Sequence, residues 1–112
     1  MSLADENCQP LSGAQHRLTP ADCTALLAQL PKWESDDQGR LRRRYRFPDF
    51  AAALAFTNRL GEIAEAQGHH PDLELGWGYV TVHLITHDVG GLSRNDFIVA
   101  ARIDALPRPA DA

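Results

Sequence analysis

Histidine is concentrated in one short part of this 112-residue chain. Four of its five histidines, His69, His70, His83 and His87, fall within the nineteen residues from 69 to 87. The unperturbed pKa of imidazole, about 6.5, lies closer to neutral pH than that of most other side chains. Neighbouring imidazoles can therefore supply an acid and a base together, and they are also common metal ligands.

The sequence around His83 and His87 alternates as a strand does. The largely apolar set Val80, Val82, Leu84 and Thr86 is expected to meet the helices. The other face then looks out from the uncovered side of the sheet. Residues four apart along a strand are separated by about 13 Å, too far for both to bind one ion. That outward face carries Tyr79, Thr81, His83, Ile85 and His87.

Three interpretations of the cluster stay open at this point. A metal site could use His69, His70 and His87, although no cysteine or second carboxylate has a diagnostic spacing. Structural hydrogen bonds at turns would explain any one of these histidines better than they explain three together. The third interpretation is metal-free general acid–base catalysis, for example in a dehydration, which protonates a leaving oxygen and removes a proton nearby. His16 stands alone and is given no role.

Composition limits the class of protein. A chain of 112 residues, 44% hydrophobic and 23% charged, is typical of one soluble globular domain. A net charge of −4 argues against nucleic-acid binding. The one basic run, residues 40–44, alternates as a strand and is expected to be a solvated strand face, with an anion-contacting face as the alternative.

Targeting and redox features are sparse. No stretch approaches the roughly 20 apolar residues of a membrane span, and the N-terminus lacks the layout of a signal peptide. Cys8 and Cys23 fit no metal or redox spacing. We therefore expect a cytoplasmic protein that binds neither membranes nor nucleic acid.

The first part of the chain divides into a leader and a helix. Residues 1–17 are polar and lack periodicity, which predicts a flexible leader before a single domain at 18–106 and a tail at 107–112. Thr19 as N-cap, Pro20 at the first helical position and Asp22 as the capping-box acid predict a helix that ends before Pro31.

The remaining elements alternate in type. A hairpin opens at Trp33, turns at 36–39 and returns along 41–47, and a helix from 49 ends at Gly68. Strands at 73–75 and 79–86 follow, and Ser93 caps a last helix that runs toward residue 107. The order α-β-β-α-β-β-α predicts an α+β fold, a four-stranded antiparallel sheet with three helices packed on one face.

Several motifs occur together at a specific spacing. They are EAQGHHPD at 65–72, YVTV at 79–82, THD at 86–88, and Gly91-Leu92-Ser93 followed by Asp96. In this combination, from about Leu18 to Ile103, the chain resembles the pterin-4a-carbinolamine dehydratases, also known as the dimerisation cofactor of a homeodomain transcription factor. The HHP motif alone would be weak evidence.

The resemblance implies a definite reaction. Members expel the hydroxyl of 4a-hydroxytetrahydropterin as water and give quinonoid dihydropterin, with no metal or organic cofactor. Aromatic amino-acid hydroxylases produce that pterin substrate, so a link to such a hydroxylase in cofactor recycling is implied. The catalytic histidines of the family match His69, His70 and His87. By analogy, His70 and His87 transfer protons, and His69 positions the hydroxyl.

The resemblance also assigns five substrate-binding positions. Glu65 matches an acid near the pterin ring, with a solvated glutamate as the alternative. Asp96 matches the acid after the GLS motif, where it could also cap the last helix. Trp33 matches an aromatic at the pocket mouth, with an ordinary core tryptophan as the alternative. Pro71 and Asp88 complete the set.

Two further expectations concern partners and a departure from the family. The last helix is apolar or small nearly all round, which predicts that a second subunit covers one side in a homodimer or homotetramer. A non-enzymatic dimerisation or assembly partner is the alternative function, but it would not need all three histidines. Animal members have an arginine where this chain has Asn95, so any charge contact of that arginine is in doubt here.

Overall fold

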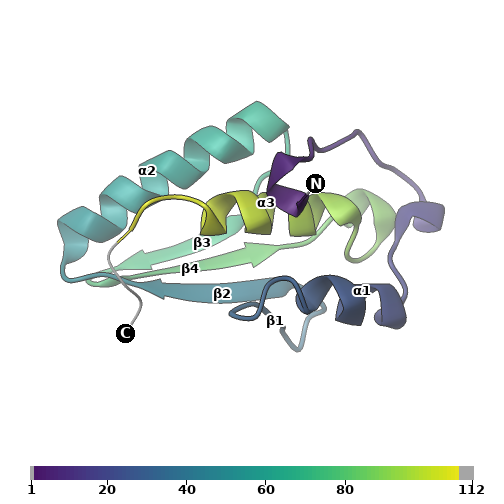
Figure 1. Ribbon diagram of the computed structural model, residues 1–112, viewed down its shortest axis with the longest axis horizontal. Coiled ribbons are helices and arrows are strands. Elements are labelled where there is room, and N and C mark those ends of the chain that lie inside the picture. Colours follow the sequence, from purple (N-terminus) through teal and green to yellow (C-terminus); the bar gives the residue numbers. More distant parts are fainter. Residues whose placement is uncertain (1, 109–112) are drawn as a thin grey trace.

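The computed structural model describes residues 2–108. Its four strands form one antiparallel sheet in the order β1-β2-β4-β3. This confirms the α+β prediction and the α-β-β-α-β-β-α order (Figure 1). The elements are η1 (Leu3–Asp5), η2 (Ala14–His16), α1 (Pro20–Leu27), β1 (Glu34–Ser35), β2 (Leu41–Arg46), α2 (Phe50–Gln67), β3 (Asp72–Gly76), β4 (Tyr79–Leu84), η3 (His87–Val89) and α3 (Arg94–Asp104).

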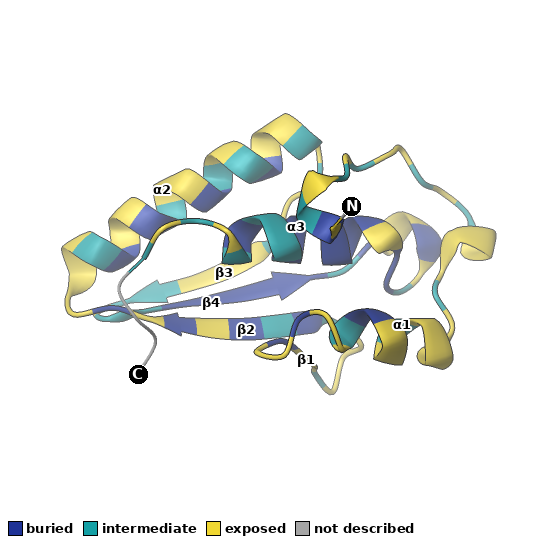
Figure 2. Ribbon diagram, in the orientation of Figure 1, coloured by how far each residue is buried: buried dark blue, intermediate teal, exposed yellow. Residues whose placement is uncertain are grey.

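The hydrophobic core lies between the sheet and the helices. Helices α2 and α3 extend over one face of the sheet, and α1 contributes Leu26 to the same core (Figure 1). Alternate residues of β2 and nearly all of β4 are buried, whereas the outward face of α2 is exposed (Figure 2). The largest fully buried apolar side chains are Tyr45, Phe97, Leu41, Leu60, Leu84 and Ile103.

The predicted helix boundaries are confirmed by their caps. The Thr19 hydroxyl accepts from the Asp22 N–H at 3.1 Å, and the Asp22 carboxylate accepts from the Thr19 N–H at 3.3 Å. Gly68 adopts the left-handed conformation (φ 64°) at the end of α2, as glycine does at low cost. Within residues 2–108, no helix combines the length and apolar character needed to cross a membrane.

One predicted strand is too long. β4 ends at Leu84, not at Thr86, because the chain then closes a separate loop. In that loop the Thr86 N–H donates to the Gly91 carbonyl at 2.9 Å, and residues 87–89 form η3. His87 is therefore exposed on a short helical turn instead of pointing from a strand face.

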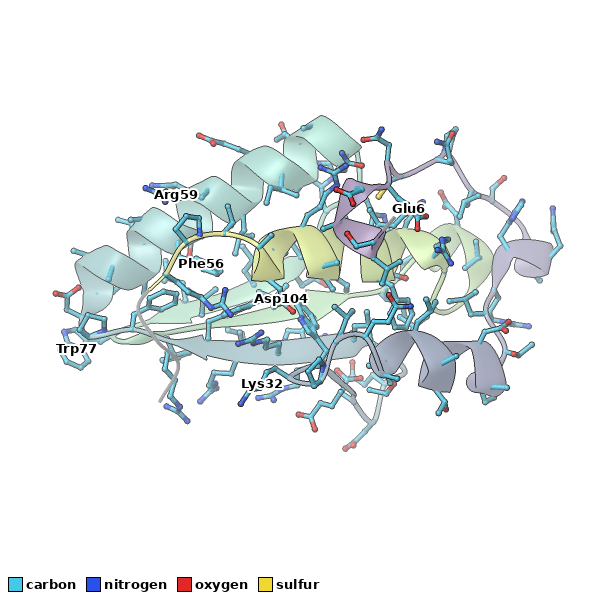
Figure 3. All side chains as sticks on the ribbon, viewed as in Figure 1. Glu6, Lys32, Phe56, Arg59, Trp77 and Asp104 are labelled. Atoms are coloured by element: carbon cyan, nitrogen blue, oxygen red, sulfur yellow. The ribbon has the colours of Figure 1, made fainter. Side chains whose placement is uncertain are left out.

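Residues 2–17, predicted to be a flexible leader, lie against the domain. Leu3 is only 3% exposed because η1 packs on α3. The Arg94 guanidinium donates two hydrogen bonds of 2.7 Å to Glu6, which lowers the pKa of that carboxyl. In Figure 3 Glu6 lies beside η1, over α3. The side of α3 that was expected to meet a second subunit is thus covered by this chain's own N-terminal segment.

The basic strand β2 does not present all of its arginines to solvent. Arg44 and Arg46 are exposed on the open face, as predicted for a solvated strand. Arg43 is only 5% exposed, because it points into the helix layer and donates to Asp104 at 2.8 Å. The same carboxylate accepts from the Trp33 indole at 3.0 Å and from the Tyr45 hydroxyl. Asp104 thereby links the end of α3 to β2 (Figure 3).

This shared carboxylate predicts a large stability effect. Asp104→Ala removes hydrogen bonds from three side chains, one of them the cation Arg43, and should lower the free energy of unfolding by about 2–4 kcal/mol. Urea denaturation followed by tryptophan fluorescence measures the change. The exposed turn variant Asp37→Ala should be neutral; equal stability of both variants would contradict the assigned role of Asp104.

Candidate active site

The end of α2 places two histidines next to each other. The His69 N–H donates to the Ala64 carbonyl at 3.2 Å, and the Gly68 N–H donates to the Glu65 carbonyl at 3.4 Å. These are the two bonds of a Schellman motif, which needs the left-handed residue that Gly68 supplies. The chain leaves the helix at a fixed angle, with His69, His70 and Pro71 leading into β3.

A buried carboxylate orients His69. Asp96 is fully buried in the first turn of α3, and its Oδ1 lies 2.6 Å from His69 Nε2. Its Oδ2 accepts from the Ser93 N–H at 2.9 Å and from the Thr86 hydroxyl at 2.8 Å. Because the Thr86 hydroxyl donates to Asp96, the Ser93 hydroxyl 2.7 Å away donates to Thr86. Since a carboxylate oxygen accepts, the His69 ring donates to Asp96 from Nε2, which leaves Nδ1 for another partner.

His70 lies in a different environment. Its Nε2 hydrogen-bonds Glu65 Oε2 on the last turn of α2. Both side chains are largely exposed, at 60% and 78%. A surface pair of this kind contributes little to stability. The pair instead affects position, because Glu65 holds the His70 imidazole beside the point where the chain leaves α2.

A cavity of about 320 Å³ opens beside His69. Its wall includes Thr86 and Asp88, the residues on either side of His87. Ligand pockets begin at about this size. The structure thus brings His69, Asp88 and the Asp96 network to one cavity, with His87 in the short turn between two wall residues and His70 next to His69. The full lining is Gln9, Pro10, Leu11, Ser12, Gly68, His69, Thr86, Asp88 and Asn95.

His83 belongs to another site. It lies on the open face of the sheet, as predicted, but it is only 8% exposed because charged side chains cover it. Its Nε2 donates to Glu74 Oε2 at 3.0 Å, which lowers the pKa of that carboxyl, and its Nδ1 lies 3.6 Å from Asp36 Oδ2. Among residues 2–108, no group of three or more His, Cys, Asp or Glu side chains is arranged to hold a metal ion.

Trp33 lies apart from the histidines. It is 5% exposed and packs edge-on against Tyr45, with ring centroids 6.3 Å apart. Its indole bonds Asp104 at the far end of α3, eight residues or about 12 Å along the helix from Asp96. Of the two interpretations of Trp33, this position favours the core tryptophan.

Sequence reasoning missed part of the site. It did not assign Thr86 and Ser93 to the support of His69, although both lie in the quoted motifs. The spacing of Ser93 and Asp96 is a capping signal. It predicted where the helix begins, but it did not predict that Asp96 also bonds His69. Asn95 and residues 9–12 gave no sequence signal for their place on the cavity wall.

Comparison with known proteins identifies the family. The profile described as Pterin 4 alpha carbinolamine dehydratase matches residues 16–106. The chain belongs to the pterin-4a-carbinolamine dehydratase family. The resemblance drawn from the motifs is thereby confirmed, and the matched region includes every histidine discussed above.

Individual relatives of this family cover almost the whole chain. A protein of Microcystis aeruginosa named "Putative pterin-4-alpha-carbinolamine dehydratase" is 48% identical over 98% of this chain and 97% of its own length. One of the same name from Chlorobium limicola is 52% identical over 88% of this chain and 90% of its own.

Solved structures agree with the fold. The transcriptional coactivator/pterin dehydratase of Brucella melitensis has a TM-score of 0.76 at 30% identity, covering 80% of this chain and 96% of that one. A pterin dehydratase-like protein described as a RuBisCO assembly factor in the alpha-carboxysome has a TM-score of 0.57 at 30% identity, covering 66% and 87%.

The Asp96 contact predicts a spectroscopic signature in this family member. The His69 Nε2 proton should be protected from exchange and shifted downfield, because it is held by a fully buried carboxylate. Proton NMR with ¹⁵N-labelled histidine detects it. The signal should disappear in Asp96→Ala, which should also lose about 1–3 kcal/mol of stability. The exposed His16 is the internal control, and a His69 proton that exchanges as fast as that of His16 would refute the contact.

Proposed function

We propose that this chain is a cytoplasmic enzyme that dehydrates 4a-hydroxytetrahydropterin to quinonoid dihydropterin by acid–base catalysis, in the recycling of a pterin cofactor. The observation that carries the proposal is the position of His69, which is oriented by buried Asp96 at the wall of a cavity of about 320 Å³. His70 and His87, both exposed, lie next to that wall along the chain. Membership of the family supports the choice of reaction.

The reaction needs two proton transfers. The bond from C4a to the hydroxyl oxygen breaks, that oxygen gains a proton and leaves as water, and N5 loses its proton as the C4a–N5 double bond forms. We assign these transfers to His70 and His87, whose exposed rings can exchange protons with solvent between turnovers. His69 is better suited to holding the hydroxyl, since Asp96 restrains its ring and leaves Nδ1 available.

Carboxylates complete the proposed site. Glu65 bonds His70 and keeps that ring beside the end of α2. Asp88, on the cavity wall, is an acceptor that can bind the amino and ring N–H donors of a pterin. Pro71 is half-buried directly after His70 and restrains it to extended backbone. Substrate contact by Trp33 is not part of the proposal, because that side chain lies in the core.

The alternative is a non-enzymatic assembly role. One solved relative is described as a RuBisCO assembly factor, at 30% identity over 66% of this chain. The Asp96–Thr86–Ser93 support of His69 favours the enzyme, because a protein that only binds partners has no need of an oriented imidazole in a cavity.

Stopped-flow absorbance of freshly generated 4a-hydroxytetrahydropterin tests the proposal. Wild-type protein should accelerate the decay of the substrate well above its spontaneous rate. His70→Ala and His87→Ala should each lose about 10²–10⁴-fold of the catalysed rate, because positioned proton transfer typically contributes that much.

Two controls complete the test. His83→Ala changes a histidine outside the cavity and should retain the catalysed rate if the protein remains folded by circular dichroism. Treatment with EDTA should change nothing if the reaction is metal-free. Wild-type protein that leaves the spontaneous rate untouched would exclude the dehydratase and make the assembly role the leading hypothesis.

We also propose that the chain forms a homodimer or homotetramer. The N-terminal segment covers the outer side of α3, so the contact between subunits must use another surface. Phe50 and Leu54 are 44% and 41% exposed, and residues four apart lie on the same face of a helix. This face of α2 is an exposed apolar surface, and we assign it the contact with a second copy.

A charge on this face should break the assembly. Leu54→Glu should lower the mass of the assembly, from dimer to monomer or from tetramer to a smaller species, because association through this face would bury an unpaired carboxylate. Analytical ultracentrifugation at micromolar concentration measures the mass of the particle. Gln38→Glu, which adds the same charge on the exposed hairpin turn, should leave the oligomer intact. A wild-type protein that sediments only as monomer would exclude the homo-oligomer.

A further inference from the structure

We propose that residues 9–12 form a substrate-contacting wall of the His69 cavity, and that Asn95 is the residue that positions this wall. The inference rests on the proposed function and extends it to a segment outside the matched family region, which begins at residue 16. It concerns the binding of the pterin, not the proton transfers.

The cavity is formed between two distant parts of the chain. Gly68, His69, Thr86 and Asp88 line one side, and residues 9–12 line another. In Figure 1 the N-terminal segment runs from η1, over α3, past the end of α2 to η2. Without this segment the His69 side would be an open surface and not a cavity.

Asn95 holds the start of the wall with both of its polar atoms. Its Oδ1 accepts from the Gln9 N–H at 3.1 Å, and its Nδ2 donates to the Gln9 carbonyl at 2.7 Å. The side chain is only 6% exposed, and it lies directly before Asp96 in α3. The Cys8 N–H also donates to Gln67 Oε1 at 2.7 Å. The wall is therefore tied to the same helix turn that orients His69.

The far end of the wall is fixed independently. The Gly13 N–H donates to the Asp88 carbonyl at 2.9 Å, and the Leu18 N–H donates to the Leu92 carbonyl at 2.8 Å. Residues 10–12 span the distance between the anchors at Gln9 and Gly13. Because Asp88 itself lines the cavity, both ends of the wall are attached to residues of the site.

The wall carries groups that bind but do not titrate. Leu11 is half-buried and, with Pro10, offers an apolar surface to a flat heterocycle, while Gln9 and Ser12 offer an amide and a hydroxyl to its polar edge. None of the four can act as an acid or base near neutral pH. They should therefore stabilise bound substrate and transition state equally, which changes KM and leaves kcat nearly unchanged.

The amide chemistry of Asn95 fits this role. An amide presents both a donor and an acceptor to the Gln9 peptide group, whereas a cationic side chain has donors only. The two hydrogen bonds seen here require the asparagine. We therefore assign Asn95 as a positioning residue for the wall.

Steady-state kinetics of two variants test the inference. Asn95→Ala should raise KM about tenfold or more, with kcat within about twofold of wild type. Leu11→Ala, which alters the wall without touching a buried anchor, should raise KM in the same direction. The Kd of the fluorescent probe biopterin, measured by quenching on titration with protein, should rise in parallel. His16→Ala, on the same segment but outside the cavity, is the matched control and should match wild type.

The outcomes separate this inference from the proposed function. An active wild type whose KM and biopterin Kd are unchanged by both Asn95→Ala and Leu11→Ala would overturn the wall alone. A fall in kcat at constant KM in folded variants would overturn it too, because it would place these residues in the chemistry. A wild type without dehydratase activity would overturn the proposed function and this inference together.

Discussion

The candidate site depends on the burial of one carboxylate, that of Asp96. A fully buried carboxylate is costly unless each oxygen finds hydrogen-bond donors, and here they come from His69, Thr86 and Ser93. These donors lie on three segments: the chain leaving α2, the loop before η3, and the N-cap of α3. Satisfying the charge therefore brings the ends of separate elements together, and the cavity forms where they meet.

Helix α3 connects the buried Asp96 carboxylate to a second set of hydrogen bonds at its other end. Asp96 is in its first turn, and Asp104, at its last residue, binds Trp33, Arg43 and Tyr45. The helix is thus fixed at both ends by carboxylates, with apolar residues buried between them. The N-terminal segment covers its outer side, which makes that segment available as a cavity wall. One helix therefore joins the stability of the core to the geometry of the site.

The histidines that suggested chemistry occupy unlike environments. His69 is restrained in a cavity, His70 and His87 are exposed, and His83 is covered by carboxylates on the open face of the sheet. The four histidines are close in sequence, but they do not form one cluster in the structure. Alternation along β4 correctly separated His83 from the apolar face, but only the early end of the strand at Leu84 explains why His87 does not share its surroundings.

The sequence by itself determined the local structure: the caps at Thr19 and Gly68, the alternation of β2, the element order and the histidine motifs. These depend on interactions within a few residues, so short patterns encode them. The alternation of β2 already placed Arg43 on the same face of that strand as Leu41 and Tyr45. Only the tertiary structure decided that Asp104 is the partner of Arg43, that Leu3 anchors the N-terminal segment, and that Asp96, 27 positions away, is the partner of His69. Such pairings depend on how whole elements pack, because a buried charge binds whichever donor the fold brings within reach.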